Sequence, residues 1–298
     1  MNAEVVIVGG SFAGLSSALV LARACRKVIV VDAGWPRNRF AEHSHGFLGH
    51  DGRTPDAILG DARKQLANYP TVALLQGEAN SARQLDGGFA IELADGRTVE
   101  AKRLILATGV RDELPDIPNL RACWGKSVVH CPYCHGYEFR GQPLGVLATT
   151  AQSIHTATLL PDWGPATCFR HASFHFDEEQ RAKLAARGVS MEETAVRTLL
   201  AVEGKVEAVL LEDGRRVPLT ALFVTPRTYL NSPIAEQLGC AIDDGPTGQV
   251  IRVDELKKTT VAGVFAAGDA SSPMASVTMA AAAGAISGFA AHQSLMFG

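Results

Sequence analysis

Two cysteines separated by two residues carry the clearest chemistry in this chain. Cys131 and Cys134 lie in the run CPYCHG at positions 131–136. This spacing is typical of a dithiol redox centre or of half a zinc site. Because proline suits the first turn of a helix, a helix is predicted directly after Cys131, with both sulfurs near its N-terminus, where thiolate is favoured. His135 adds a group that can take up or release a proton near neutral pH.

A zinc site is the alternative interpretation of this pair. Cys123, His130 or His135 could supply further ligands, but the sequence has no second Cys-x-x-Cys to complete a four-sulfur site. His43 and His45 also have the spacing of metal ligands, without a cysteine or carboxylate cluster near them in sequence. We therefore predict a redox-active pair and no metal.

Composition and charge exclude several classes of protein. A net charge of −3 argues against a nucleic-acid partner or an anionic membrane surface. Six cysteines in 298 residues are too few for a disulfide framework, so a reducing compartment is expected. The apolar stretch 274–291 is rich in alanine, glycine and serine, which favours a closely packed internal helix over a membrane span. With no export signal in the first residues, the prediction is a cytoplasmic protein.

The first 32 residues have the pattern of a dinucleotide-binding βαβ unit. A β-branched strand at 5–8 leads into a glycine-containing turn, a helix at 15–24, a second strand at 27–31 and an acid. Gly9 permits the tight turn, Gly14 allows close helix–strand packing, and Asp32 can accept from a ribose hydroxyl. Ser11 replaces the middle glycine but is small and can cap the helix. The predicted cofactor-binding residues here are Gly9, Ser11, Phe12, Ala13, Gly14 and Asp32.

Three further segments give cofactor signals. A buried strand in the run 104–109 opens onto a turn with Thr108 and Gly109. A second buried strand in the run 259–269 ends in Gly268 and Asp269, whose carboxylate can bind a sugar or ribitol hydroxyl. A helix is predicted from Met274, with its N-terminal N–H groups facing the cofactor. The polar loop 34–54 is expected to cover the cofactor. The predicted binding residues in these segments are Arg39, His45, Thr108, Gly109, Gly268, Asp269, Ser276 and Val277.

The segment after the cysteine pair has the pattern of a second nucleotide-binding unit without its glycines. Ala148, Thr149 and Thr150 occupy the positions of a glycine-rich turn, where a Cβ obstructs the approach of a pyrophosphate. Arg170 and His171 are the nearest approach to a basic pair for a 2′-phosphate. We predict a Rossmann-like half that keeps its fold and has lost its ligand. The predicted fold class is therefore α/β, with two Rossmann-like domains.

In order and spacing, these motifs resemble the low-molecular-weight thioredoxin reductases over essentially the whole chain. The run CPYCHGYE at 131–138 is similar to a subgroup, the FAD-dependent dithiol oxidases that close the disulfide of gliotoxin- and holomycin-type metabolites. Thioredoxin reductases have an aspartate after the second cysteine, where this chain has His135. They also have an intact NADPH fingerprint, which is absent here. Both departures favour the oxidase subgroup.

The resemblance implies FAD as the cofactor and a non-contiguous flavin domain. Residues 1–114 and 245–298 would form the FAD-binding domain, and 115–244 an inserted NADPH-domain-like part that carries the cysteine pair. By the same resemblance, Cys134 lies beside the flavin, Cys131 faces the substrate, and the chain forms a homodimer. His135 is the candidate base that generates the attacking thiolate.

The predicted function is the oxidation of a small-molecule dithiol, or of a small thiol protein, to a disulfide, with electrons passed to FAD and then to dioxygen. One alternative is an NAD(P)H-dependent disulfide reductase similar to thioredoxin reductase, which works in the opposite direction. Another is a non-catalytic flavin or thiol redox sensor. The missing glycines at 148–150 favour the oxidase, since access of phosphate to the backbone decides nucleotide affinity.

Overall fold

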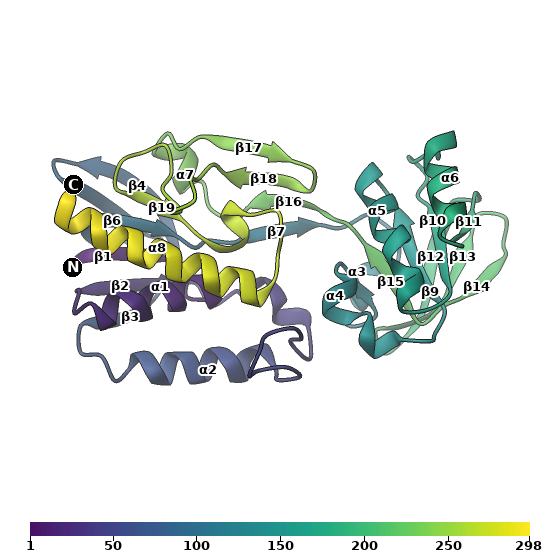
Figure 1. Ribbon diagram of the computed structural model, residues 1–298, viewed down its shortest axis with the longest axis horizontal. Coiled ribbons are helices and arrows are strands. Elements are labelled where there is room, and N and C mark those ends of the chain that lie inside the picture. The colour runs from purple at the N-terminus through teal and green to yellow at the C-terminus, as the bar shows by residue number, and fades with distance from the viewer. The chain divides into compact units, whose positions relative to one another are not determined.

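The computed structural model describes all 298 residues, which form two compact units (Figure 1). The first unit consists of Met1–Arg39, Phe47–Arg111 and Thr228–Gly298. The second consists of Phe40–Gly46 and Asp112–Arg227.

A seven-stranded sheet is the centre of the first unit. Its order is β3 (Val72–Gln76), β2 (Val28–Asp32), β1 (Asn2–Val8), β6 (Thr98–Leu106), β5 (Gly88–Leu93) and β4 (Ala79–Leu85), with β19 (Val264–Ala266) paired to β6. Strands β3, β2, β1, β6 and β19 are parallel. The first half of β6 pairs antiparallel with β5, and its second half pairs with β19. The parallel strands therefore end together at one edge of the sheet.

Both faces of this sheet are covered, because its central strands are β-branched and apolar throughout. Along β1, Val6 and Val8 pack into a core on one face, while Val5 and Ile7 pack into a second core on the other. Successive side chains of a strand point to opposite faces, so a continuous apolar run requires cover on both sides.

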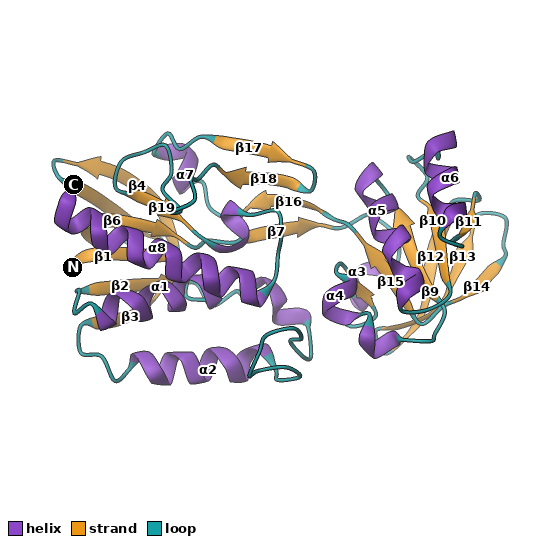
Figure 2. Ribbon diagram, in the orientation of Figure 1, coloured by secondary structure: helices purple, strands orange, loops and turns teal.

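Three helices and several short elements complete the first unit (Figure 2). The helices are α1 (Phe12–Arg23), α2 (Pro55–Leu66) and α8 (Val277–Phe297). The short elements are η1 (Arg37–Phe40), α7 (Ile234–Gln237) and η4 (Gly268–Ser271), with a small sheet in the order β17 (Ile242–Gly245), β18 (Gly248–Ile251), β16 (Arg227–Leu230) and β7 (Val110–Glu113).

The last helix, α8, packs on α1 through small residues. A Cβ at Gly284 would lie 2.1 Å from the carbonyl oxygen of Ala13, so the two backbones touch at this point. The Ser17 hydroxyl, also in α1, lies 2.8 Å from the Gly284 carbonyl oxygen and 2.9 Å from the Ser287 hydroxyl. The small residues of this stretch thus serve helix packing, as predicted, and none of the helices has both the length and the apolar character needed to cross a membrane.

The second unit is built on a five-stranded parallel sheet. Its order is β11 (Ser190–Glu192), β10 (Ala166–Arg170), β9 (Leu144–Ala148), β15 (Ala221–Val224) and β8 (Val128–Val129). An antiparallel sheet of β12 (Val196–Val202), β13 (Lys205–Leu211) and β14 (Arg216–Pro218) accompanies it. The helical elements are α3 (Leu120–Cys123), α4 (Pro132–His135), η2 (Tyr137–Phe139), α5 (Ala151–Leu159), η3 (Leu160–Asp162) and α6 (Glu178–Ala186).

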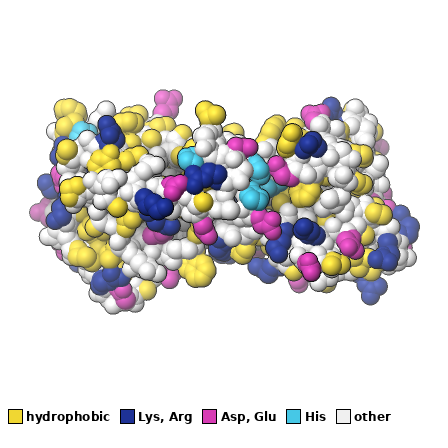
Figure 3. Space-filling model, turned by 90° about the horizontal axis from the view of Figure 1, so that it is seen from below, with side chains coloured by type: hydrophobic (Ala, Val, Ile, Leu, Met, Phe, Trp, Pro, Cys, Tyr) yellow, Lys and Arg dark blue, Asp and Glu magenta, His cyan; other side chains and the backbone are white.

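Charged side chains of both signs are interspersed on the face drawn in Figure 3, in keeping with the net charge of −3. This face has no continuous basic stripe of the kind that binds nucleic acid.

Candidate active site

The carboxyl ends of four parallel strands bring distant parts of the chain to one edge of the first unit's sheet. Val8 is in register with Val31 and Leu106, and Leu106 with Ala266. The residues that follow each of these positions therefore meet at this edge, although they come from the beginning, the middle and the end of the chain. They include Gly9, Asp32, Thr108 and Gly268, all predicted as cofactor-binding residues. Ligands of open α/β sheets bind at such an edge.

Glycine is required at three positions of the turn between β1 and α1. Gly9 has a φ of +108°, and a Cβ there would lie 2.1 Å from the Ala107 carbonyl oxygen. A Cβ at Gly14 would lie 1.8 Å from the Gly9 carbonyl oxygen. Gly10, which sequence reasoning missed, would place a Cβ 2.6 Å from that of Asp32. The turn is consequently a shallow surface of bare backbone.

The helix after this turn presents its N-terminus to the same edge. Phe12 and Ala13 begin α1, and Ser11 is its N-cap residue with extended backbone angles. The expected cap is absent, because the Ser11 side chain accepts no hydrogen bond from the helix. The first N–H groups of α1 are thus left for an anion such as a pyrophosphate.

Asp32 is held in place by backbone and side-chain donors at the end of β2. Its Oδ1 accepts from the N–H groups of Gly10 at 3.1 Å and Gly34 at 3.2 Å. Its Oδ2 lies 3.3 Å from a guanidinium nitrogen of Arg63 in α2. Such a fixed carboxylate is suited to accept hydrogen bonds from a ribose.

Asp269 has an arginine partner that the sequence did not indicate. Arg37 Nη1 donates to Asp269 Oδ2 at 2.8 Å, and both side chains are largely buried. The preceding Gly268 has a φ of +73° and would place a Cβ 3.0 Å from that of Ala13. Asp269 therefore lies on η4 close to the start of α1, at the same edge of the sheet.

The remaining predicted cofactor residues lie in different surroundings. The carbonyl oxygens of Thr108 and Gly109 accept from the side-chain and backbone N–H groups of Asn231. Ser276 caps α8 by accepting from Met279 N at 3.1 Å, so that this helix begins at Val277 rather than at the expected position 274. Arg39 donates to the Pro36 carbonyl oxygen at 2.9 Å. His45 belongs to the second unit, where its Nε2 lies 3.5 Å from Glu138 Oε1.

These features fit a bound dinucleotide. The glycines let the turn pack closely against Ala107 and Asp32, the uncapped α1 N-terminus supplies donors for a pyrophosphate, and Asp32 and Asp269 supply acceptors for sugar-type hydroxyls.

The cysteine pair lies at the start of α4 in the second unit. Cys131 is the N-cap residue, with extended backbone, and Pro132 occupies the first helical position, as the sequence predicted. The N–H groups of Cys134 and His135 both donate to the Cys131 carbonyl oxygen at 3.2 Å. This turn holds the two sulfur atoms 2.7 Å apart. The pair is partly exposed, so a substrate thiol can reach it.

His135 is partly buried beside the pair. Burial, together with the charge of His45, lowers the pKa of His135 from 6.5 to about 4. Its imidazole is consequently neutral at pH 7, so it can accept a proton but does not act as an acid.

Aromatic side chains surround the pair. Tyr133, between the two cysteines, is mostly exposed, and its ring meets that of Trp163 edge-on at 5.5 Å. A Cβ at Gly136 would lie 2.8 Å from the Trp163 indole, so glycine is needed where the chain leaves α4. His130, next to Cys131, lies 6.1 Å from the Trp124 ring. Trp163 is 29 residues from Cys134 in sequence, so no local pattern could have indicated its contacts with Tyr133 and Gly136.

The nucleotide position in the second unit is occupied by the protein's own side chains. Where β9 ends, the backbone N–H groups of Thr149 and Thr150 point to the Ser153 hydroxyl at 3.2 and 3.4 Å. Thr150 and Ser153 form a reciprocal capping box at the start of α5. The amides that would bind a pyrophosphate are therefore already satisfied.

Arg170, the candidate residue for binding a 2′-phosphate, is also engaged in hydrogen bonds within the protein. Its Nε donates to the Glu193 carbonyl oxygen at 2.6 Å, and its Nη1 to those of Ala172 and Phe174 at 3.2 and 3.3 Å. These bonds hold its own loop, so the sequence expectation of a degenerate site has a structural basis. No cluster of three or more histidine, cysteine or acidic side chains in the structure is arranged to hold a metal ion.

The chain is similar in structure and sequence to several known proteins. An oxidoreductase from Agrobacterium tumefaciens has a crystal structure that superposes with a TM-score of 0.95, at 47% identity over 100% of this chain and 99% of that one. The structure of HlmI superposes with a TM-score of 0.92, at 37% identity over 99% of this chain and 92% of that one. Thioredoxin reductase tcpT of Claviceps purpurea (strain 20.1) is 34% identical over 98% of this chain and 94% of its own length.

The fold and the site define a flavin-dependent disulfide oxidoreductase of the thioredoxin reductase type. The chain belongs to the pyridine nucleotide-disulphide oxidoreductase family, whose model it matches over residues 3–284. The predicted fold class, the resemblance to thioredoxin reductases and their gliotoxin-type relatives, and FAD as the cofactor are thereby confirmed.

Proposed function

We propose that this enzyme oxidises a small-molecule dithiol to an intramolecular disulfide through Cys131 and Cys134. The observation that carries the proposal is the nucleotide position of the second unit. There the Ser153 hydroxyl accepts from the backbone N–H groups of Thr149 and Thr150. We infer from these engaged amides that the thiol substrate, and not a nicotinamide nucleotide, supplies the electrons. The pair then works as an oxidant, in the opposite direction to a reductase.

The protein side chains carry out the thiol chemistry in two exchange steps. A substrate thiolate attacks Cys131 Sγ of the oxidised pair, forms a mixed disulfide and releases Cys134 as a thiolate. The second substrate thiolate then attacks the substrate sulfur of this mixed disulfide and releases Cys131. The substrate loses two electrons and two protons, and the cysteine pair gains the electrons. Bound FAD supplies the two-electron chemistry that reoxidises the pair, with dioxygen as the final acceptor.

His135 is the proposed acceptor of the substrate proton. Its imidazole is neutral above about pH 4, since burial and the charge of His45 lower its pKa. A base with so low a pKa is unprotonated at neutral pH, and it holds a thiol proton only transiently before the proton passes to solvent water. We therefore assign His135 to the transfer of the proton away from the pair.

In this proposal the first unit is the FAD-binding domain and the second is the inserted domain that carries the pair. The FAD-binding residues are those of the strand edge, its turn and its flanking loops: Gly9, Ser11, Phe12, Ala13, Gly14, Asp32, Arg39, Thr108, Gly109, Gly268, Asp269, Ser276 and Val277. His45, which contacts Glu138, stays a predicted cofactor contact on the grounds of the sequence pattern alone.

The enzyme is also proposed to be a cytoplasmic homodimer. Met279, Ile286 and Phe289 are exposed along one side of α8, with Met296 and Phe297 at its end. An apolar stripe on the last helix of the first unit suits the association of two copies expected from the resemblance to thioredoxin reductases. Sedimentation equilibrium at micromolar concentration tests this, and a monomeric mass would contradict it.

The alternative is a disulfide reductase driven by NAD(P)H, in line with the printed names of several relatives. Anaerobic mixing separates the two functions. A small dithiol should bleach the flavin absorbance of the FAD-loaded enzyme within the mixing experiment, whereas excess NADPH should leave it unchanged. Rapid bleaching by NADPH would overturn the oxidase proposal. Repeated turnover of the dithiol in air, with peroxide as a product, would also exclude a non-catalytic redox sensor.

A further inference from the structure

A cavity of about 370 Å³ opens on the first unit and shares no residue with the proposed FAD site. It is bounded by the β4–β5 hairpin, β6, the segment that leads into β19, and the C-terminal end of α8. Its volume is within the range of small-molecule binding sites. All its walls belong to one unit, so its shape is fixed by the packing of that unit alone.

The charged side chains around this cavity are all positive, and the C-terminal Gly298 also lines it. Lys102, Arg103 and Lys258 line it, and no acidic side chain does. None of these three cations forms an ion pair with a carboxylate of the protein. Glu4 feels the charge of Lys102, but its own carboxylate is committed to Arg26 at 3.0 Å and to the N–H of Lys27 at 2.9 Å. These three positive charges outnumber the terminal carboxylate of Gly298, so the cavity has a net positive charge that attracts an anion.

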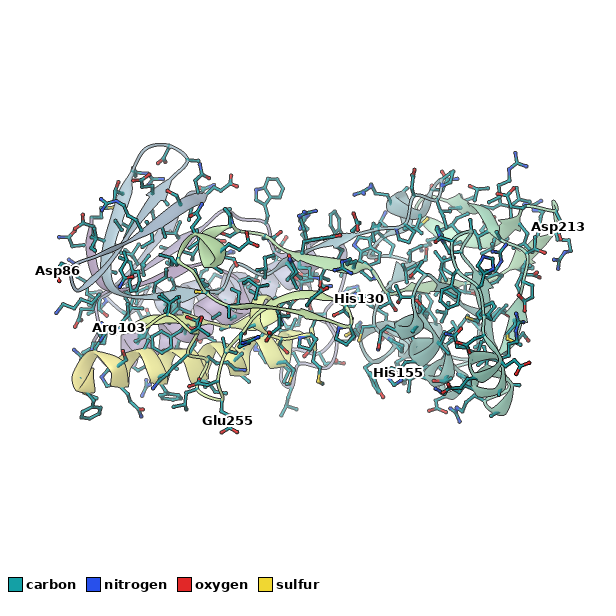
Figure 4. All side chains as sticks on the ribbon, turned by 90° about the horizontal axis from the view of Figure 1, so that it is seen from above. Asp86, Arg103, His130, His155, Asp213 and Glu255 are labelled. Carbon is teal, nitrogen blue, oxygen red and sulfur yellow. The ribbon has the colours of Figure 1, made fainter.

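Arg103 is fixed in a position that suits anion binding. Its Nε donates to the Ser294 hydroxyl at 2.5 Å, its Nη2 to the Ser294 carbonyl oxygen at 2.6 Å and its Nη1 to the Lys102 carbonyl oxygen at 2.9 Å. In Figure 4 the labelled Arg103 lies beside α8, which carries Ser294. A guanidinium has five N–H donors, so one on each terminal nitrogen remains for a ligand. Because the side chain is already ordered, a ligand would not bear the entropic cost of fixing it.

The rest of the wall is apolar. Phe89, Val264 and Phe265 are almost fully buried and line the cavity. Gly263 has a φ of +81°, and a side chain there would come within 3.2 Å of the Phe89 ring and 3.4 Å of Arg103 Cδ. The glycine keeps the apolar wall and the guanidinium open to the same space.

We propose that this cavity binds a small organic anion, with its carboxylate or phosphate group against Lys102, Arg103 and Lys258 and an apolar ring or chain against Phe89. The proposal does not depend on the function of the cysteine pair. A wholly polar ion such as inorganic phosphate would leave the apolar wall exposed, and an uncharged ring would leave the three cations without a counter-charge.

The test uses the FAD-loaded enzyme, so that the dinucleotide site is filled, and 1-naphthyl phosphate as the probe in isothermal titration calorimetry. We expect saturable binding at one site, weakened by added sodium chloride. Both 1-naphthol and inorganic phosphate should bind about tenfold more weakly or worse, since each offers only one of the two contacts.

The double variant Lys102→Gln/Lys258→Gln removes two exposed charges and keeps Arg103, whose bonds to α8 are structural. Its affinity for the probe should fall by about tenfold or more, with unchanged dithiol oxidation. The matched control, Lys205→Gln/Arg216→Gln, removes two exposed charges from the second unit and should bind the probe like the wild type. Equal affinity of both double variants, or no saturable binding by the wild type, would overturn the proposal.

Discussion

Gly284→Ala should destabilise the first unit, although alanine is normally the better helix former. Gly284 lies in α8 where that helix crosses α1, and the added Cβ would be 2.1 Å from the Ala13 carbonyl oxygen. Ordinary contacts begin near 3.4 Å, so the two helices must separate by about 1.3 Å, the difference between these distances. The obstacle is backbone, which cannot rotate away as a flexible side chain can.

The expected loss follows from two effects. Forcing a methyl group into a closely packed contact costs about 1–3 kcal/mol. The same displacement would stretch the bonds from the Ser17 hydroxyl to Gly284 and Ser287, now 2.8 and 2.9 Å, beyond hydrogen-bonding distance. Each lost bond costs about 0.5–1.5 kcal/mol, although Ser17 keeps its contact with the Ala13 carbonyl oxygen. Together we expect a loss of about 2–6 kcal/mol in the free energy of unfolding.

Gly60→Ala is the matched control, because Gly60 is also in a helix, α2, with no heavy atom within 4 Å of its added Cβ. That variant should gain about 0.4–1 kcal/mol, since alanine restricts the unfolded chain. Urea denaturation followed by circular dichroism, at fixed protein and FAD concentrations, gives the comparison. The bound flavin absorbance should also fall in Gly284→Ala, because α1 begins at the proposed pyrophosphate turn.

The result that would refute this reasoning is a Gly284→Ala variant as stable as Gly60→Ala with full flavin content. It would mean that α1 and α8 can part without cost, and that the glycine contact does not hold the first unit together.

Four other predictions concern the proposed active site. Asp269→Ala should lose FAD, because a ribitol-type hydroxyl loses its acceptor and Arg37 its partner; full occupancy measured by flavin absorbance would contradict the assignment. Cys131→Ser and Cys134→Ser should both lose nearly all turnover, and only Cys134→Ser should accumulate a mixed disulfide with an activated substrate, read by mass spectrometry; an adduct confined to Cys131→Ser would reverse the roles. His135→Ala should be slower on the order of 10²–10⁴-fold at neutral pH, with the deficit shrinking at high pH as substrate thiols ionise unaided. Since the lowered pKa of His135, about 4, penalises its protonation in the folded state, wild-type stability should decline as pH falls from about 6.5 towards 4, and His135→Gln should show a smaller decline; identical pH profiles in denaturation would argue against a buried neutral imidazole.

Local patterns in the sequence predicted the elements of the first unit well. Gly9 and Gly14 stand where bare backbone is needed, and Pro132 marks the start of the helix that carries Cys134. A single sequence displays these glycines and this proline, although the Ala107 carbonyl oxygen that Gly9 packs against is distant in sequence. The start of α8 was misplaced because the Ser276 cap was not recognised.

Contacts between distant residues could not be predicted in the same way. Arg37 and Asp269 are 232 residues apart, and their ion pair depends on β19 joining the sheet beside β6. The contact of His45 with Glu138 likewise depends on a short loop leaving the first unit's sequence to join the second unit. The occupied amides at Thr149 and Thr150 are an intermediate case, because the sequence showed the missing glycines but not the Ser153 hydroxyl that replaces a phosphate.

The packing of α8 on α1 also sets the order in which the chain can fold during synthesis. The first βα unit is made early, but α8, which packs on its helix α1, and β19, which pairs with β6, are made much later. Until then α1 has no cover for the surface that Gly284 and Ser287 contact, and β6 lacks its neighbour β19. The second unit has nearly all its residues in one continuous segment and can form earlier. The second unit can therefore fold from essentially one stretch of the chain, whereas the first unit needs segments that are far apart in sequence.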